Sequence, residues 1–218
     1  MLFVDSSGPS EVAEVFAWGA IAGVTTNPLL FAKQSGGADF EARIREILAV
    51  SRGPVSVEVV GEREEDMLAE ARSYHAWDAS RVVVKVPLTE PGLRVIARLA
   101  AEGIATNATC LMNFAQAYVC ALAGATYVSI FSGRVRDMGY DVRTVIADTR
   151  RQLDRERLPS KLIVGSVRQP IDVTESLSAG ADVVTVTPTV LRALLKNPRT
   201  DETIREFSEA WSTRHKGP

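Results

Sequence analysis

Residues 81–109, RVVVKVPLTEPGLRVIARLAAEGIATNAT, contain one complete strand–helix–strand unit. The run at 81–86 is rich in valine, which is typical of a parallel strand buried on both faces. The segment at 92–103 predicts a helix because its apolar residues share one stripe: Leu93, Ile96 and Leu99. Gly103 ends that helix, and IATNAT at 104–109 predicts the next strand.

The same alternation continues in both directions along the chain. Eight strands are predicted, at 2–5, 22–26, 55–60, 81–86, 104–109, 126–131, 161–166 and 182–187. Further helical patterns lie at 40–51 and 141–158. Eight strands, each followed by a helix and with no linker, favour a single-domain (β/α)₈ TIM barrel, an α/β fold, over residues 1–200.

An open doubly wound sheet is the alternative fold. Such sheets usually carry a glycine-rich phosphate loop after the first strand. Here the first strand runs into DSSGP at 5–9, and the chain has neither a GxGxxG nor a Walker A motif. The barrel is therefore the better interpretation.

The segment 201–218 is one helix more than a barrel needs. Its apolar residues Ile204, Phe207 and Trp211 form a stripe at i, i+3 and i+7. This extra C-terminal helix either folds back on its own barrel or docks on a neighbouring subunit.

Composition excludes several classes of protein. With 25 Lys+Arg and 27 Asp+Glu, the formal net charge of −2 gives no electrostatic footprint for nucleic acid or an anionic membrane. Two cysteines indicate a reducing, cytoplasmic compartment, and two histidines without a CxxC pair argue against a metal site. No apolar run reaches membrane-spanning length, and the N-terminal residues do not resemble a signal peptide.

Polar residues recur at the carboxyl ends of the predicted strands, where barrel enzymes place their chemistry. Side chains two apart on a strand share a face, so this inward-facing set can be traced. It comprises Asp5, Thr26, Asn27, Glu58, Lys85, Asn107, Thr109, Ser129, Phe131, Arg134, Ser166 and Arg168. A polar group on nearly every strand predicts an active site.

Lys85 interrupts the apolar run VVVKVP and is the sharpest single signal. A lysine there either reaches solvent or pairs with a barrel carboxylate. A desolvated amine can also attack a carbonyl at neutral pH, which makes Lys85 a candidate Schiff-base nucleophile. Asp5 and Glu58 either balance its charge or divide the proton transfers that this chemistry needs.

Arg134, Ser166 and Arg168 are candidates for an anion clamp, since guanidinium groups suit phosphate. Taken singly, each arginine is also compatible with an ordinary surface position. Together with the lysine they indicate a phosphorylated sugar as substrate. Cys110 lies next to the predicted site but has no nearby histidine, so it is expected to be a small core residue and not a nucleophile.

Several motifs, in order, resemble the small-transaldolase branch of the transaldolase/fructose-6-phosphate aldolase family. They are DSS at 5–7, GVTTNP at 23–28, SVEVV at 56–60, VVVKVPLTEPGL at 82–93, TNAT at 106–109, AGATYVSIFSGRVRD at 123–137 and LKNPRTD at 195–201. The resemblance implies a metal-free and cofactor-free class I aldol mechanism on a (β/α)₈ barrel.

The resemblance also implies a role for each matching residue. Lys85 corresponds to the Schiff-base lysine, Asp5 to the general acid/base, and Glu58 with Thr109 to the pair that holds the catalytic water. Asn27, Asn107 and Ser129 correspond to donor-binding residues, and Arg134, Ser166 and Arg168 to the phosphate-binding set. Thr26 and Phe131 are further expected substrate contacts.

Glu58 and Phe131 favour transaldolase over the acceptor-independent aldolases, which have glutamine and tyrosine at these places. Asn107 and Arg168 point the same way. The segments CLMNFAQ at 110–116 and GYD at 139–141 depart from the family pattern, as does Ser-Ser after Asp5. An acceptor-independent aldolase, a specialised transaldolase that makes a longer sugar phosphate, and a weakly catalytic sugar-phosphate-binding protein therefore stay open.

For its surroundings, the resemblance implies a cytoplasmic transferase of carbohydrate metabolism, such as the pentose phosphate pathway. Its partners would be sugar phosphates, not nucleic acid or membrane. It would form a homo-oligomeric ring, a pentamer or decamer, with exchanged C-terminal helices.

Overall fold

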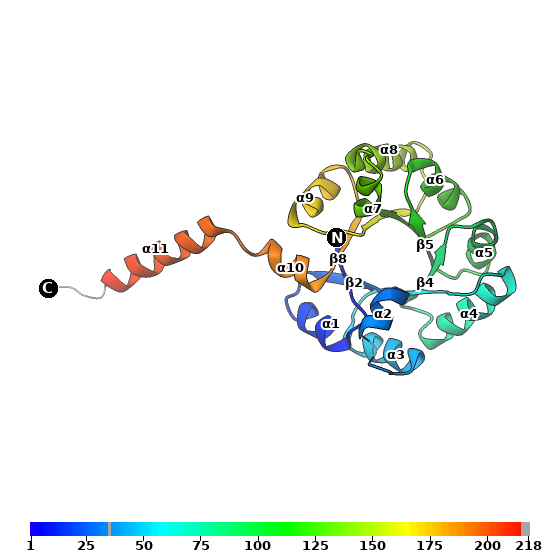
Figure 1. Cartoon of the computed structure of the whole chain (residues 1–218), viewed down its shortest axis with the longest axis horizontal. Coiled ribbons are helices and arrows are strands. Elements are labelled where there is room, and N and C mark those ends of the chain that lie inside the picture. The colour runs from blue at the N-terminus through cyan, green and yellow to red at the C-terminus, as the bar shows by residue number, and fades with distance from the viewer. Residues whose placement is uncertain (35, 215–218) are drawn as a thin grey trace.

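Eight parallel strands close into a barrel in the computed structural model, which describes residues 1–34 and 36–214. Each strand pairs with the next, and the first pairs with the last (Figure 1). The strands are β1 (Leu2–Asp5), β2 (Ile21–Thr25), β3 (Val55–Glu58), β4 (Val82–Pro87), β5 (Thr106–Leu111), β6 (Tyr127–Phe131), β7 (Lys161–Gly165) and β8 (Val183–Val186). The predicted (β/α)₈ barrel is confirmed, with strand ends that differ from expectation by no more than two residues.

Helices surround the barrel on its outer side (Figure 1). They are α1 (Pro9–Phe16), α3 (Phe40–Val50), α4 (Glu64–Trp77), α5 (Glu90–Ala101), α6 (Phe114–Leu122), α8 (Val142–Arg155), α9 (Pro170–Ser178) and α10 (Pro188–Leu194). The helices predicted at 40–51, 92–103 and 141–158 are confirmed as α3, α5 and α8. Two short helices, α2 (Pro28–Gln34) and α7 (Ser132–Asp137), follow β2 and β6 and were not predicted.

The unit at 81–109 shows why these residues fold locally as they do. Thr89 caps α5 by accepting a hydrogen bond from the backbone N–H of Gly92 at 3.0 Å. The helix buries Val95, Ile96 and Leu99 completely against the barrel. Gly103 then ends the turn with a φ of 74°, which a side chain would strain. Burial of the apolar stripe therefore fixes the helix against β4 and β5.

Inside the barrel, apolar side chains fill the layer toward the amino ends of the strands. These are Phe3, Val83, Tyr127, Ile163 and Val183. Gly23 leaves room for the Phe3 ring, since a Cβ at residue 23 would lie 2.7 Å from Phe3 Cζ. Two residues further along, the inward layer becomes polar on β1, β4, β6 and β8, with Asp5, Lys85, Ser129 and Thr185, and this polar layer forms the site.

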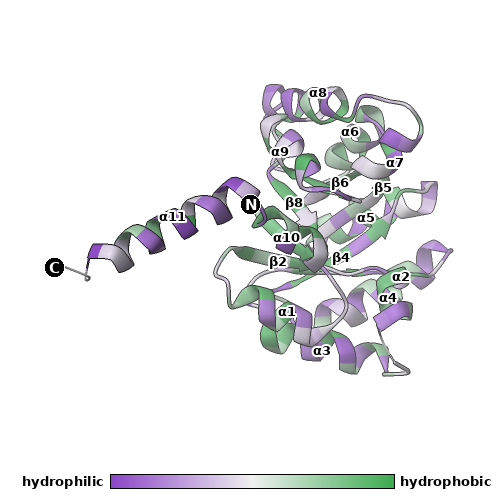
Figure 2. Ribbon diagram, turned by 60° about the vertical axis from the view of Figure 1, so that its left-hand side comes forward, coloured by the Kyte–Doolittle hydropathy of each residue, from purple (hydrophilic) through white to green (hydrophobic). Residues whose placement is uncertain are grey.

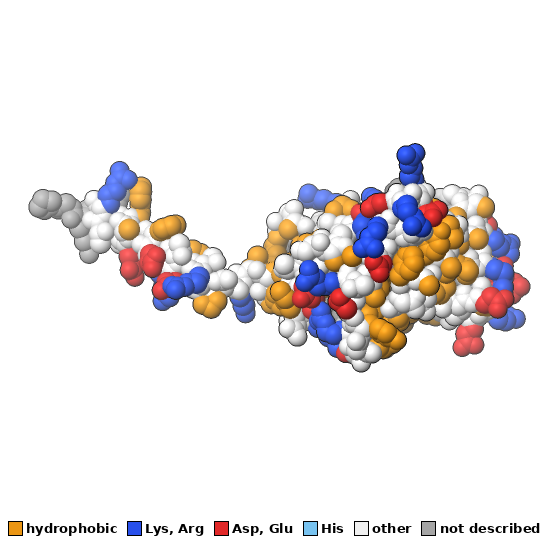
Figure 3. All heavy atoms as spheres, turned by 90° about the horizontal axis from the view of Figure 1, so that it is seen from above, with side chains coloured by type: hydrophobic (Ala, Val, Ile, Leu, Met, Phe, Trp, Pro, Cys, Tyr) orange, Lys and Arg blue, Asp and Glu red, His pale blue; other side chains and the backbone are white. Residues whose placement is uncertain are grey.

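The last helix, α11 (Pro198–Arg214), extends away from the barrel (Figures 1 and 2). None of its residues is buried, and Ile204, Phe207 and Trp211 are 57%, 70% and 60% exposed. Hydrophobic side chains lie open on its surface (Figure 3). The structure thus does not show the helix folded back on its own barrel. Residues 215–218, which were expected to continue it, lie outside the described residues.

Among the described residues, no helix is both long and apolar enough to cross a membrane.

Candidate active site

A cavity of about 350 Å³ opens at the carboxyl ends of the strands. Nine of the predicted site residues line it: Asp5, Asn27, Glu58, Lys85, Asn107, Ser129, Phe131, Arg134 and Ser166. Three others, Thr26, Thr109 and Arg168, lie beside it without lining it. The barrel therefore brings together residues from β1 through β7 that are far apart in the sequence.

Lys85 is buried at the centre of this cavity, with 5% of its surface exposed. The register of β3 against β4 pairs Glu58 with Lys85, and their side chains form an ion pair of 2.8 Å between Oε2 and Nζ. The ammonium group also donates to the backbone carbonyl of Thr26 at 3.1 Å. An amine held against a carboxylate has an acceptor for its proton within direct reach.

Asp5 lies at the end of β1 on the same inward face. Its Oδ1 accepts a hydrogen bond from Thr25 Oγ1 at 2.9 Å, and that hydroxyl lies 2.6 Å from the hydroxyl of Thr185. Burial raises the pKa of the Asp5 carboxyl, while the nearby Lys85 charge and the Thr25 hydrogen bond partly offset the rise. A carboxyl with a raised pKa is suited to accept and return a proton near neutral pH.

A buried chain of hydrogen bonds orients Asn107. Its Oδ1 accepts from Ser129 Oγ at 2.7 Å, and its Nδ2 donates to Ser56 Oγ at 3.1 Å. Because both ends of the amide are engaged, its orientation is fixed before any substrate binds. Such a group can present a defined donor or acceptor to a hydroxyl of a ligand.

The β2–α2 segment contributes Thr26 and Asn27. The Thr26 hydroxyl donates to the backbone carbonyl of Ser56 at 2.8 Å. The backbone carbonyl of Thr26 accepts from Lys85 Nζ. Asn27 Oδ1 accepts from Leu30 N at 3.0 Å at the start of α2. Its side chain also hydrogen-bonds Asp5, which lowers the pKa of that carboxyl.

Thr109 is completely buried at the carboxyl half of β5. Its Oγ1 has no nitrogen or oxygen partner among the described residues. A buried hydroxyl without such a partner is costly and is uncommon in proteins. This hydroxyl is therefore suited to hold a small polar molecule such as water.

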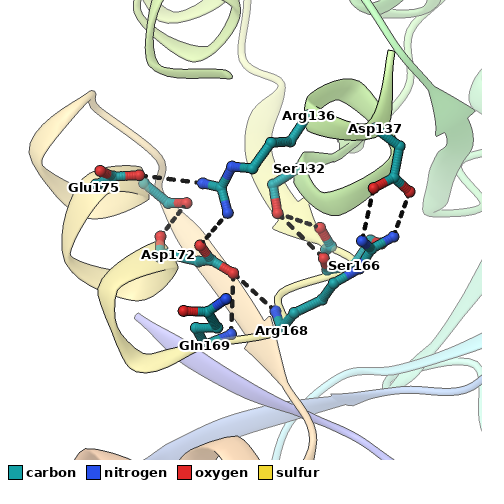
Figure 4. Close-up of polar contacts among 10 residues, drawn as sticks. Ser132, Arg136, Asp137, Ser166, Arg168, Gln169, Asp172 and Glu175 are labelled. Carbon is teal, nitrogen blue, oxygen red and sulfur yellow. Dashed lines mark hydrogen bonds and ion pairs between the residues drawn. The ribbon is translucent and has the colours of Figure 1, made fainter. Parts of the chain in front are cut away.

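The three predicted anion-binding residues differ in their positions. Arg134 lines the cavity, is exposed, and makes no ion pair with another described residue. Ser166 lines it with a φ of 57°, and its carbonyl accepts from Gly133 N at 3.0 Å. Arg168 instead pairs with Asp137 at 2.5 and 2.7 Å, beside the cavity (Figure 4).

Four residues around the cavity were given no role by sequence reasoning: Thr25, Ser56, Cys110 and Thr185. Thr25, Ser56 and Thr185 are inward-facing residues that the period-two rule could have identified. Cys110 was expected next to the site as a small core residue: its place beside the site is confirmed, since it lines the cavity, but the expected burial is wrong, since it is exposed. It has a φ of 63° where the β5–β6 register shifts, and this left-handed turn rotates its side chain out of strand alternation.

The arrangement has a definite chemical capacity. A buried amine lies against one carboxylate and near a second carboxyl with a raised pKa. A carbonyl compound in the cavity could be attacked by the amine, with protons passing to and from the two acids. A guanidinium at the rim suits an anionic group on the same compound.

Comparison with protein families matches residues 2–216 to the family described as transaldolase/fructose-6-phosphate aldolase. A relative from Thermoplasma acidophilum, named "Probable transaldolase", is 44% identical over 96% of this chain and 94% of its own length. Proteins of the same name from Thermoplasma volcanium and Thermus thermophilus are 43% and 40% identical, each over 96% of this chain and over 94% and 97% of their own lengths.

Among solved structures, inosine 5′ monophosphate dehydrogenase from Legionella pneumophila superimposes with a TM-score of 0.60. The sequence identity is 15%, and the match covers 87% of this chain and 58% of that one. At this identity the likeness shows the fold alone.

Proposed function

Because the chain belongs to the transaldolase/fructose-6-phosphate aldolase family, we propose that this transferase moves a dihydroxyacetone unit through a Schiff base on Lys85. The donor is a ketose phosphate such as fructose 6-phosphate or sedoheptulose 7-phosphate, and the acceptor is an aldose phosphate. One observation carries the proposal: a buried Lys85 pairs with Glu58 beside Asp5, in a polar cavity at the carboxyl end of the barrel.

The first step joins the amine to the ketose. Lys85 transfers a proton toward Glu58, 2.8 Å away, and the freed amine attacks the C2 carbonyl to give a carbinolamine. Glu58 and Thr109 hold the water that mediates loss of hydroxide. The buried Thr109 hydroxyl supports this role, because its hydrogen bond is to the Cys110 thiol and it has no nitrogen or oxygen partner among the described residues. The products are a protonated imine and one water molecule.

The second step breaks the carbon chain. Asp5 accepts the proton of the C4 hydroxyl, the C3–C4 bond breaks, and its electron pair moves into the protonated imine to form an enamine. An aldose phosphate leaves. The three-carbon enamine then attacks the aldehyde of an acceptor, Asp5 returns the proton, and water hydrolyses the new imine.

Binding of the donor divides between the two ends of the sugar. Asn27, Asn107 and Ser129 face the hydroxyl groups near Lys85, with Thr26 behind them. At the other end, Arg134, Ser166 and Arg168 bind the phosphate. Arg134 lines the cavity and makes no ion pair with another described residue, which supports this assignment.

The proposal is tested by the release of glyceraldehyde 3-phosphate from fructose 6-phosphate, with and without erythrose 4-phosphate. Sustained release only with the acceptor is the expected result. For sedoheptulose 7-phosphate the aldose phosphate released is erythrose 4-phosphate, with glyceraldehyde 3-phosphate as the acceptor. No release of the aldose phosphate from either donor, with or without acceptor, contradicts the proposal and leaves a sugar-phosphate-binding protein. Sustained release without acceptor identifies the second candidate, an acceptor-independent aldolase.

Phe131 decides between these two candidates. Its ring lines the cavity and has no hydroxyl with which to position water for protonating the enamine. We therefore expect Phe131→Tyr to raise acceptor-independent release of glyceraldehyde 3-phosphate relative to the unmodified enzyme. The same release rate in both proteins would remove Phe131 from the discrimination.

The setting of the enzyme is part of the same proposal. It acts in the cytoplasm, in the pentose phosphate pathway or in a secondary pathway that makes a longer sugar phosphate. Residues 110–116 are proposed to determine which length of acceptor sugar fits, and the position of Cys110 in the cavity wall supports this. The exposed apolar stripe of α11 supports docking of this helix on a neighbouring subunit of a ring.

A further inference from the structure

We propose that Asp137 is a positioning residue for phosphate: it holds the guanidinium of Arg168 so that its Nε–H faces Ser166 at the rim of the cavity. The inference deepens the proposed function and rests on it, because that function places the donor phosphate at Ser166 and Arg168. No assigned role in the mechanism above requires Asp137.

The hold on the guanidinium is bidentate. Arg168 Nη1 and Nη2 donate to the two carboxylate oxygens of Asp137 at 2.7 and 2.5 Å (Figure 4). A bidentate pair fixes the plane of the guanidinium as well as its place. The two terminal nitrogens are therefore directed toward Asp137, and Nε is left without a described hydrogen-bond acceptor.

Gly133 shows where Nε lies. A Cβ at this residue would be 2.7 Å from Arg168 Nε and 2.9 Å from Ser166 Oγ. Both polar atoms are thus less than 3 Å from one point above the first turn of α7. Ser166 lines the cavity and Arg168 lies beside it, so the Ser166 hydroxyl and the Arg168 Nε–H are two donors near one point at the edge of the cavity. The Ser166 carbonyl, 2.5 Å from the same point, already accepts from Gly133 N.

A second acid fixes the backbone that carries Arg168. Asp172 is 1% exposed, and it accepts from the backbone N–H groups of Arg168 and Gln169 at 2.9 and 3.0 Å. Arg136 compensates its charge at 2.5 Å (Figure 4). Because Asp172 holds the backbone, only the long side chain of Arg168 can still change its conformation. The pair with Asp137 restricts that side chain.

Asp137 also opposes phosphate through its charge, so the test must separate charge from orientation. The pair is exposed, with side-chain exposures of 53% and 54%. Salt screens exposed charges, and at about 0.5 M ionic strength the Debye length falls to about 4 Å. The two hydrogen bonds from Arg168 to Asp137 act at 2.7 and 2.5 Å, inside that length, so salt weakens them less than it weakens the repulsion between Asp137 and a more distant phosphate.

The experiment measures binding of inorganic phosphate by ³¹P NMR titration at high salt, for the unmodified enzyme, Asp137→Ala, Arg168→Ala and the double variant. Asp137→Ala should weaken binding about fivefold, the upper range for an exposed pair. In the Arg168→Ala background it should have no further effect. Asp148→Ala is the matched control, since it breaks an exposed Arg–Asp pair of 2.9 Å on α8, and it should leave binding unchanged.

Unchanged or tighter phosphate binding by Asp137→Ala at high salt would overturn the inference, as would an equal loss in the Arg168→Ala background. Thermal melts check folding, and Asp137→Asn, which keeps one acceptor oxygen, should fall between the two proteins. Borohydride trapping with fructose 6-phosphate separates the two proposals. Failure to trap Lys85 contradicts the proposed function, whereas the phosphate titrations judge Asp137 without any turnover.

Discussion

Lys85 is a buried charge whose surroundings are arranged for reaction as much as for stability. Removing an ammonium group from water costs several kcal/mol, in general, unless a partner compensates it. Here Glu58 supplies the compensation at 2.8 Å, and Thr26 supplies a carbonyl at 3.1 Å. An apolar residue would be easier to accommodate in a valine-rich strand, so the lysine is best explained by its chemistry.

Asp5 is likewise a buried ionisable group, and its ionisation lowers the stability of the folded chain. Its pKa is raised by burial, so its ionised form is disfavoured in the folded chain. The carboxyl therefore lowers stability as the pH rises above its unfolded value of 3.8, and the loss is complete above the folded pKa.

We expect Asp5→Asn to raise the thermal midpoint at pH 8 relative to the unmodified protein, and to raise it less at pH 4. The same variant should lose donor cleavage by at least ~10² while still forming the imine. Thermal melts at the two pH values and a cleavage assay measure both effects. A lower midpoint at pH 8, or full cleavage activity, would contradict the role given to Asp5.

Residue-scale predictions from sequence succeeded where strand register determines the outcome. Glu58 and Lys85 are paired in β3 and β4, so their meeting follows from the barrel itself. The direction of the Arg168 side chain does not follow in this way. It depends on Asp137 at the end of α7, a helix of six residues that is too short to leave a helical period in the sequence.

The short helices α2 and α7 determine the rim of the cavity at the scale of elements. No residue of α2 is buried, so packing alone does not hold this helix. Its last residue, Gln34, accepts from Ser7 N at 2.7 Å and donates to Glu11 at 2.9 Å. One side chain therefore ties α2 to the loop that follows Asp5.

We expect Gln34→Ala to loosen α2 and to raise the KM for the donor a few-fold, because each lost hydrogen bond is worth about 1 kcal/mol. Hydrogen–deuterium exchange should increase in peptides covering 28–34. Lys33→Ala is the matched control, since this neighbouring exposed side chain makes no hydrogen bond to a described residue. Equal exchange in the two variants would show that Gln34 does not anchor the helix.

Element-scale predictions from sequence were limited by length and by backbone irregularity. Amphipathic segments such as α3 and α5 were found from their apolar stripes. Cys110 was misplaced because a register shift and a left-handed φ interrupt strand alternation, and no residue type announces either feature.

The whole molecule consists of a closed barrel and a helix that makes no buried contact with it. The barrel completes its hydrogen bonding between β1 and β8, before α11 begins. Its interior layers and outer helices need no residue from Pro198 onward. The barrel is therefore expected to stay folded without α11, whereas the assembly of subunits is expected to need this helix.

A chain that stops after Lys196 should keep the circular dichroism of the barrel and sediment as a monomer. The full chain should sediment as a larger ring, because the exposed apolar side chains of Ile204 and Phe207 on α11 are expected to be buried against a neighbouring subunit. Phe207→Ser in the full chain should also give a monomer in sedimentation, whereas Glu206→Ser, a change at the adjacent exposed residue, should keep the ring. A monomeric full chain would refute docking of α11 on a neighbouring subunit. An unfolded truncated chain would show that the barrel needs α11 to fold.

Lys85 is proposed to form the covalent intermediate, and borohydride trapping locates that intermediate. The enzyme is treated with fructose 6-phosphate and borohydride and digested, and the modified peptide is identified by mass spectrometry. A reduced three-carbon unit is expected on the peptide that contains Lys85, and none in Lys85→Met. A labelled peptide elsewhere, or no label with donor present, would contradict it.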